Sequence, residues 1–169
     1  LRFVSDAEPH LDISRFKLKG LVDGAGVTVT SYCEEEGAFR WQSDVAGDLE
    51  LEADREQLFR GLTNLGQNAL EAGARHVRVS ATREDGWITL DVVDDGPGLA
   101  PEAREKLFQP FAGSARDGGI GLGLAIVHDI VRAHGGDVSL IDPPEGGPFP
   151  GAGFRIKLPE KQGFRHKRS

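Results

Sequence analysis

Two asparagines four residues apart form the first pattern that could do chemistry. Asn64 and Asn68 are spaced to lie one above the other on one face of a helix. Asparagine is a mediocre helix former, so the pair interrupts an otherwise well-patterned amphipathic segment. The amide oxygen of asparagine is a reasonable ligand for Mg²⁺, which prefers oxygen and keeps several waters. The alternative is that both side chains only hydrogen-bond to neighbouring loops.

A second pattern follows the apolar segment 87–93. Asp94 ends this segment, and Gly96 and Gly98 come directly after it. A carboxylate in this position can accept a hydrogen bond from an exocyclic amine, such as that of a purine. The glycines would let a flat ring approach the backbone. Asp-Gly and Pro-Gly pairs are also common in plain tight turns, which is the alternative interpretation.

The third pattern is a glycine-rich run, Gly118 to Leu124, that leads straight into an expected helix. Glycine supplies 23 of the 169 residues, against a usual fraction of about 7%. Much of the excess lies in the segments 96–98 and 113–123. Unobstructed amides at a helix N-terminus form an anion site. The run lacks the Lys-Ser/Thr of a P-loop, and its alternative interpretation is a flexible hinge.

Hydrophobic periodicity indicates which elements position these patterns. Glu84-Asp85-Gly86 predicts a hairpin, and an acidic turn at 34–37 is expected to join the first two strands. The order predicts an α+β fold, a two-layer α/β sandwich with a mixed, mostly antiparallel sheet and helices on one face. It lacks the strand–helix alternation of a dinucleotide-binding fold. We expect strands at 27–30, 39–42, 49–53, 76–82, 87–93, 137–142 and 153–158, and helices at 55–72, 101–107 and 121–134.

Composition limits the classes of partner. The formal net charge of −7 argues against a nucleic-acid surface, which needs an excess of lysine and arginine. No apolar run is long enough to cross a bilayer, so we expect no direct membrane contact by this chain. The lone Cys33 fits a reducing, cytoplasmic location. The chain begins at Leu1 and contains no methionine, so we expect a fragment of a longer protein that could carry membrane spans upstream.

Together the three patterns, with Phe108-Gln109-Pro110-Phe111 between the second and the third, resemble one ATPase superfamily. Its members are sensor histidine kinases, gyrase, the large heat-shock chaperones and the mismatch-repair ATPases. The patterns match its N box, DxGxG box, F box and second glycine box in order and spacing. The pairing of LFQPF at 107–111 with GIGLGLAIV at 119–127 is similar to the histidine-kinase branch. The resemblance covers about residues 27–158 and implies a Bergerat-type ATP-binding fold.

The resemblance implies ATP and Mg²⁺ as cofactors and assigns roles by position. Asp94 would accept from the adenine N6 amine, and Gly96 and Gly98 would shape the adenine pocket. Asn68 would coordinate Mg²⁺ between the phosphates, with Asn64 in support.

The remaining implied residues belong to the ATP lid, expected at 112–118. Arg116 is the candidate contact to the γ-phosphate, although a solvated loop charge is the alternative. Phe108 and Phe111 would pack the base of the lid. The residues that would anchor the lid and present amides to phosphate are Gly119, Gly121, Leu122 and Gly123.

One position separates a kinase from a hydrolase within this superfamily. The hydrolysing branches typically carry glutamate four residues before the Mg²⁺-binding asparagine, as general base. Here that residue is Asn64, and an amide cannot take a proton at neutral pH. Two departures also stand out: Glu71 and Ala72 replace the lysine and the aromatic residue that many kinases of the family carry. A lysine contact to phosphate and a ring against adenine are therefore in doubt.

The resemblance thus implies the ATP-binding catalytic domain of a two-component sensor histidine kinase. It would transfer the γ-phosphate to a histidine on the dimerisation domain of the same kinase, which then serves a response regulator. We expect the end of a dimerisation helix and linker at 1–23, the catalytic domain at 24–160 and a flexible tail at 161–169. The acceptor histidine is expected upstream of Leu1, so the chain should not autophosphorylate alone. The alternatives are a nucleotide-binding pseudokinase or docking module, and an ATP-hydrolysing member of the same superfamily.

Overall fold

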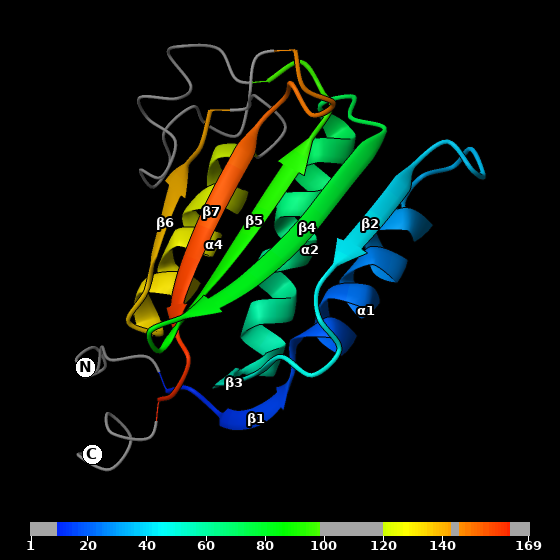
Figure 1. The fold of residues 1–169 in the computed structure, drawn as a ribbon. Coiled ribbons are helices and arrows are strands. Elements are labelled where there is room, and N and C mark those ends of the chain that lie inside the picture. The colour runs from blue at the N-terminus through cyan, green and yellow to red at the C-terminus, as the bar shows by residue number, and fades with distance from the viewer. Residues whose placement is uncertain (1–9, 99–119, 143–145, 163–169) are drawn as a thin grey trace, which may run out of the picture.

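A five-stranded sheet forms one layer of the structure, and helices form the other (Figure 1). The computed structural model describes residues 10–98, 120–142 and 146–162. The strand order is β2-β4-β5-β7-β6, in which β2 pairs with β4 in parallel and the other pairs are antiparallel. The predicted α+β class with a mixed, mostly antiparallel sheet is confirmed. The strands are β2 Arg40–Asp44, β4 His76–Glu84, β5 Trp87–Asp94, β6 Asp137–Leu140 and β7 Gly153–Pro159.

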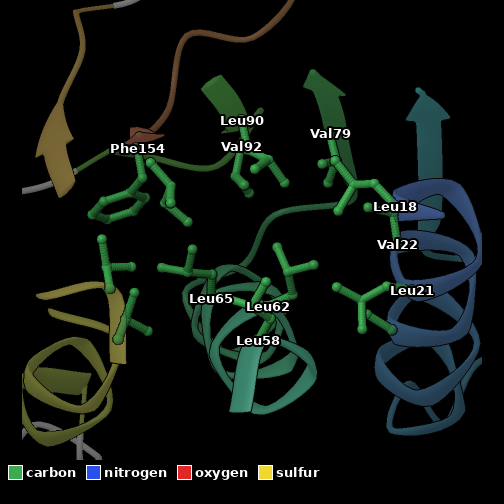
Figure 2. Packing of buried hydrophobic residues seen from close by; sticks show 14 of the residues in the cluster. Leu18, Leu21, Val22, Leu58, Leu62, Leu65, Val79, Leu90, Val92 and Phe154 are labelled. Atoms are coloured by element: carbon green, nitrogen blue, oxygen red, sulfur yellow. The ribbon is translucent and has the colours of Figure 1, made fainter. Parts of the chain in front are cut away.

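The described helices α1 (Leu18–Ser31), α2 (Arg55–Glu71) and α4 (Ile120–Ala133) cover the same face of the sheet (Figure 1). The central helix α2 directs a leucine stripe toward the sheet, as its periodicity predicts. Burial of one such leucine side chain contributes about 1.5–3 kcal/mol. Figure 2 shows leucines of α1 and α2 packing with strand side chains, among them Leu58, Leu62, Leu65, Val79, Leu90, Val92 and Phe154.

The expected strand at 27–30 is wrong, because these residues form the last turns of α1. The run is β-branched, which favours strands as an intrinsic tendency only. Here packing decides, because α1 buries one face completely, and Val29 is 0% exposed while Val27 is 73% exposed. The acidic residues 34–36 therefore lie in the connection from α1 to β2, and no hairpin forms there. The buried face of α1 comprises Leu18, Leu21, Val22, Ala25, Gly26 and Val29.

A second, two-stranded sheet lies beside the start of α2. Strand β1 (Ile13–Lys17), which the sequence did not predict, pairs antiparallel with β3 (Glu50–Asp54). β1 is largely polar, so it carries a weak hydrophobic signal. β3 leads directly into α2, and Asp54 caps that helix through Oδ1, which accepts from the backbone N–H of Gln57 at 3.1 Å.

Trp41 joins the two neighbouring helices α1 and α2. Its indole Nε1 donates to the carbonyl oxygen of Val22 at 3.1 Å. A Cβ atom added at Gly26 of α1 or at Gly66 of α2 would overlap the indole ring. Glycine inside a helix costs about 0.5–1 kcal/mol relative to alanine, and at these two positions its lack of a side chain makes room for the ring.

At the end of the structure that holds β1 and β3, buried hydrogen bonds join the end of α4 to the start of α2 and to Gln162. His134, at the end of α4, is 0% exposed, and its Nε2 accepts from the backbone N–H of Asp54 at 3.0 Å. Because an N–H group can only donate, Nε2 carries no proton, and Nδ1 donates to the oxygen of Ile130 at 2.8 Å. Gln162 Nε2 donates to the His134 oxygen at 2.6 Å.

The expected domain division at 23 and 161 stays a prediction. Helix α1 runs through residue 23, and Gln162 is 2% exposed. No helix within the described ranges is long and apolar enough to span a membrane.

Candidate functional site

Asp94 lies at the end of β5, at the opposite end of the sheet from β1 and β3 (Figure 1). Its side chain is on the helix-covered side and 8% of the residue is exposed. Oδ1 accepts two backbone hydrogen bonds, from Gly96 at 2.8 Å and from Ala152 at 3.3 Å. No described residue donates to Oδ2. One carboxylate oxygen is therefore fixed by the backbone, and the other accepts from none of the described residues.

Burial raises the pKa of the Asp94 carboxyl above its ordinary value of 3.8. The backbone hydrogen bonds from Gly96 and Ala152 lower this pKa and partly offset the effect, while the neighbouring charge of Asp95 raises it further. A partly desolvated carboxylate gains more from a hydrogen-bond donor than an exposed one does, because water competes less for it.

A pocket opens beside Asp94 between α2, β5, β7 and the start of α4. Among the described residues its walls are mostly apolar, and the polar side chains that line it are those of Asp94 and Asn68. A concave, mostly apolar pocket with few polar groups is typical of a site for a small organic ligand. The lining residues are Leu65, Asn68, Ala69, Ala72, Val92, Asp94, Pro97, Gly98, Leu124, Ala152 and Phe154.

The structure brings Asn68 to the same pocket as Asp94. Its Nδ2 is buried and has no hydrogen-bond partner among the described residues. A buried amide left in this way costs about 1–3 kcal/mol, which marks the group as one that a ligand can satisfy. Asn64 lies one turn earlier on α2, half-buried, and is not among the residues that line the pocket.

Gly96 and Gly98 lie where the sequence predicted, in the turn after Asp94. Gly98 lines the pocket and has a φ of +83°, a conformation that favours glycine. Gly96 donates its N–H to Asp94 Oδ1. These glycines bring backbone, not side chains, to the pocket.

Helix α4 begins at Ile120, so Gly121, Leu122 and Gly123 form its first turn. The next residue, Leu124, lines the pocket and is 1% exposed. The N-terminal end of α4 thus lies next to the pocket, and the anion site expected there stays a prediction. The lid residues Phe108, Phe111, Arg116 and Gly119, and the helix expected at 101–107, lie outside the described residues.

Gly151 and Ala152 belong to the site but were not predicted from the sequence. The Gly151 N–H donates to the Asp94 carbonyl oxygen at 2.9 Å, and the Asp94 N–H donates to the Ala152 oxygen at 3.0 Å. A Cβ atom at Gly151 would overlap both Asp94 Oδ1 and the backbone of Gly96. The local signal was only a Pro-Gly pair before the last strand, which is common in turns.

The two departures from the family pattern have distinct settings. Ala72 lines the pocket, so this chain presents a methyl group at the position where many kinases of the family carry an aromatic ring. Glu71 is exposed, and its Oε2 accepts from Gln67 Nε2 at 3.2 Å on the helix surface.

Residues 53–162 match the family described as histidine kinase-, DNA gyrase B- and HSP90-like ATPase. The chain is 38% identical over 127 residues to the nitrogen regulation protein NtrY of Azorhizobium caulinodans, which covers 70% of this chain and 16% of NtrY. It is 40% identical over 147 residues to the C4-dicarboxylate transport sensor protein DctB of Rhizobium meliloti, covering 83% of this chain and 23% of DctB. The chain therefore spans less than a quarter of the length of these relatives.

The solved structures agree. The catalytic domain of the histidine kinase ThkA superposes with a TM-score of 0.74 at 27% identity, covering 89% of this chain and 97% of that one. Full-length ShkA in complex with AMPPNP gives a TM-score of 0.73 at 28% identity, covering 90% of this chain and 32% of that one. The motif match over 53–162, the shared fold and the pocket beside Asp94 agree, and the chain belongs to the family of histidine kinase-, DNA gyrase B- and HSP90-like ATPases.

Proposed function

We propose that this chain is the ATP-binding catalytic domain of a two-component sensor histidine kinase. It transfers the γ-phosphate of ATP to a histidine on the dimerisation domain of the same kinase, and a response regulator receives the phosphoryl group next. The observation that carries the proposal is the pocket shared by Asp94 and Asn68. Among the described residues, Asp94 Oδ2 has no donor and the buried Asn68 Nδ2 has no hydrogen-bond partner.

Adenine is the ring that suits this pocket. Its N6 amine donates to Asp94 Oδ2, while the ring lies between apolar residues such as Leu65 and Phe154. A guanine or hypoxanthine ring places a carbonyl oxygen where adenine has the amine, and two acceptors facing each other repel. The buried carboxylate therefore selects adenine.

Mg²⁺ suits the donor set at Asn68. This ion usually takes one or two protein oxygens and completes its shell with waters and substrate phosphates. The Asn68 amide provides one such oxygen, its nitrogen can donate to a phosphate, and Asn64 supports the same helix face. When bound, the ion neutralises charge on the transferring phosphoryl group. The described residues hold no cluster of three acidic, histidine or cysteine side chains that would form a protein-only metal site.

The phosphates lie toward the N-terminal end of α4. Gly121, Leu122 and Gly123 belong to the first turn of α4, whose N–H groups have no partner within the helix and favour negative charge. The remaining roles rest on the family resemblance alone, because these residues lie outside the described ranges: Gly119 would anchor the lid, Phe108 and Phe111 would pack at its base, and Arg116 would contact the γ-phosphate.

Transfer to a histidine fits the absence of a base at position 64. A water or hydroxyl nucleophile needs a residue to take its proton, and the Asn64 amide cannot do so. A neutral imidazole already has a lone pair, so positioning and charge neutralisation are enough. Steady-state ATP turnover tests this step, since appreciable hydrolysis by the isolated domain favours the ATP-hydrolysing alternative.

The location proposed for the domain is the cytoplasm, where ATP is available. Its partners are the dimerisation and phosphoacceptor domain of the same kinase and a response regulator, without nucleic acid or direct membrane contact. We keep the division into linker at 1–23, catalytic domain at 24–160 and tail at 161–169 as part of this proposal.

Calorimetric titration with a non-hydrolysable ATP analogue, with and without Mg²⁺, tests the proposal directly. We expect adenine-selective binding that Mg²⁺ strengthens. Binding that is absent at millimolar nucleotide would instead support a docking module without transfer.

A further inference from the structure

Phe149 is buried on the sheet face that the helices leave open. It belongs to the connection between β6 and β7, yet it is only 6% exposed. Its neighbours His76 and Arg78 alternate along β4 with the core residues Val77 and Val79, so they point to the opposite face of the sheet. Nothing in the site described above uses this aromatic side chain.

The contacts of the Phe149 ring are specific. The His76 ring meets it edge-on, with centroids 4.7 Å apart and an interplanar angle of 61°. The Arg78 guanidinium carbon lies 4.9 Å from the Phe149 centroid. Edge-to-face aromatic pairs and cation–π pairs each favour one ring position over others. We call His76 and Arg78 the β4 socket.

The β4 socket is itself held by strand β2. His76 Nε2 lies 2.9 Å from Gln42 Oε1, and Gln42 Nε2 donates to Asp44 Oδ2 at 3.0 Å. Arg78 Nε lies 3.9 Å from the same Asp44 carboxylate. His76 is thus fixed to β2 by a hydrogen bond, and Arg78 by an ion-pair contact that is too long for one, so the socket gives the β6–β7 connection a defined surface to pack against.

Only three residues separate Phe149 from Ala152, which contacts Asp94 on the helix-covered side of the sheet. Gly151 fits against Asp94 and Gly96 without space for a side chain. Ala152 then donates to Asp94 Oδ1 at 3.3 Å, the longer of the two bonds to that oxygen. A hydrogen bond near the upper limit of length weakens steeply with further displacement.

We propose that Phe149 is a positioning residue for adenine selectivity. Seated in the β4 socket, it fixes the segment 149–152 so that the Ala152 N–H holds Asp94 Oδ1 and leaves Oδ2 as the atom that meets the adenine amine. The inference rests on the proposed function, because it concerns how that same pocket distinguishes purines. It assigns the open sheet face a role in the chemistry on the other face.

The test compares the affinities of ADP and inosine diphosphate for the wild type, Phe149→Ala and Phe149→Leu by calorimetry. Diphosphates lack the γ-phosphate, and the ratio of the two affinities reports on the edge of the purine ring, where the 6-amine and the N1 acceptor of adenine become a carbonyl oxygen and an N1–H. We expect the wild type to favour ADP at least about tenfold, which corresponds to one charged hydrogen bond. Phe149→Ala should lower this ratio about fivefold, mainly by weakening ADP, and Phe149→Leu should fall between.

Arg78→Ala approaches the same contact from the socket side and should lower the ratio in the same direction, by a smaller factor. Trp87→Ala is the matched control, because Lys157 lies over the Trp87 ring at 5.5 Å on another part of the same sheet. It should leave the ratio unchanged. General destabilisation would lower both affinities together and leave their ratio intact.

The outcomes separate the two proposals. If the wild type favours ADP and both Phe149→Ala and Arg78→Ala keep the wild-type affinity ratio, the role of Phe149 is overturned and the proposed function stands. A wild type that binds neither diphosphate overturns both. A selectivity loss in Trp87→Ala as large as that in Phe149→Ala would also contradict a specific role for the β4 socket.

Discussion

Two buried aspartates, Asp54 and Asp94, lie at opposite ends of the two-layer fold and are used in opposite ways. Asp54 is 5% exposed and both of its carboxylate oxygens accept from backbone N–H groups, those of Gln57 and Asp12. Asp94 is 8% exposed, and only Oδ1 accepts from the described residues. A buried polar group that folding leaves unsatisfied costs stability, so it persists where a ligand completes it. The difference separates an end whose buried groups stabilise the fold from the end at which we propose that nucleotide binds.

The largest effect should come from the stabilising end. His134→Ala removes a fully buried ring, leaves the Asp54 N–H without its partner, and takes the side-chain donor from the Ile130 oxygen, which keeps only the backbone N–H of residue 134. We expect a loss of about 3 kcal/mol in the free energy of unfolding. Urea unfolding measures it, and the folded fraction should keep the nucleotide affinity of the wild type. A stability change below 1 kcal/mol, or a selective loss of affinity, would break the contrast between the two ends.

Asp94→Asn should lower nucleotide affinity and leave stability nearly unchanged, the reverse of the effect expected for His134→Ala. The two backbone donors hold an oxygen at the Oδ1 position, so the new NH₂ group takes the Oδ2 position and faces the adenine amine. We expect ATP affinity to fall about 30-fold, or about 2 kcal/mol, with little change in the midpoint of unfolding. Calorimetric titration and urea unfolding of the same preparation test both parts. Equal affinities in the two proteins would refute the adenine contact.

Asn68→Ala should give a smaller loss that depends on the metal. The variant removes the proposed Mg²⁺ ligand and also Nδ2, which has no hydrogen-bond partner within ranges 10–98, 120–142 and 146–162. ATP affinity should fall about tenfold with Mg²⁺ present, or about 1.4 kcal/mol, and hardly at all without Mg²⁺. Gln67→Ala, a matched change on the exposed side of the same turn, should alter neither value. A loss of equal size with and without the ion would argue against metal coordination.

The smallest effect concerns pH and sharpens the role of Asp94. Because its folded pKa is raised, the carboxyl contributes stability that is fully present below its ordinary value of 3.8 and is lost as pH rises through the folded value. The stability of the wild type relative to Asp94→Asn should therefore decrease as pH rises through that window. ATP affinity should increase over the same window, because the ionised carboxylate accepts from the amine. Unfolding and titration series at several pH values measure both, and changes in the same direction would contradict this role.

Caps, turns and the buried face of α2 could be predicted from the sequence, because each depends on residues close together in the chain. The Asp54 cap, the leucine stripe of α2, the Glu84-Asp85-Gly86 hairpin and the turn after Asp94 are local patterns, and all are confirmed. The family motifs singled out Asn68 and Asp94, and the structure brings both to one pocket, while their roles stay predictions.

Features that depend on distant contacts were missed. Ala152 reaches Asp94 across 58 residues, and no local pattern encodes that approach. The strand predicted at 27–30 followed β-branched propensity, but α1 gained more by burying Leu18, Leu21 and Val29 on one helical face.

The seat of Trp41 between α1 and α2 has a practical consequence for optical measurements. The chain contains two tryptophans, and they differ in setting, since Trp87 is 38% exposed whereas Trp41 is half-buried against Gly26 and Gly66. Gly66 lies between Asn64 and Asn68 along the helix, so the indole rests on the same turn that faces the pocket. Replacing Trp87 with phenylalanine would leave Trp41 as the single tryptophan. Its emission wavelength and fluorescence quenching would then report any shift of this turn when nucleotide is added.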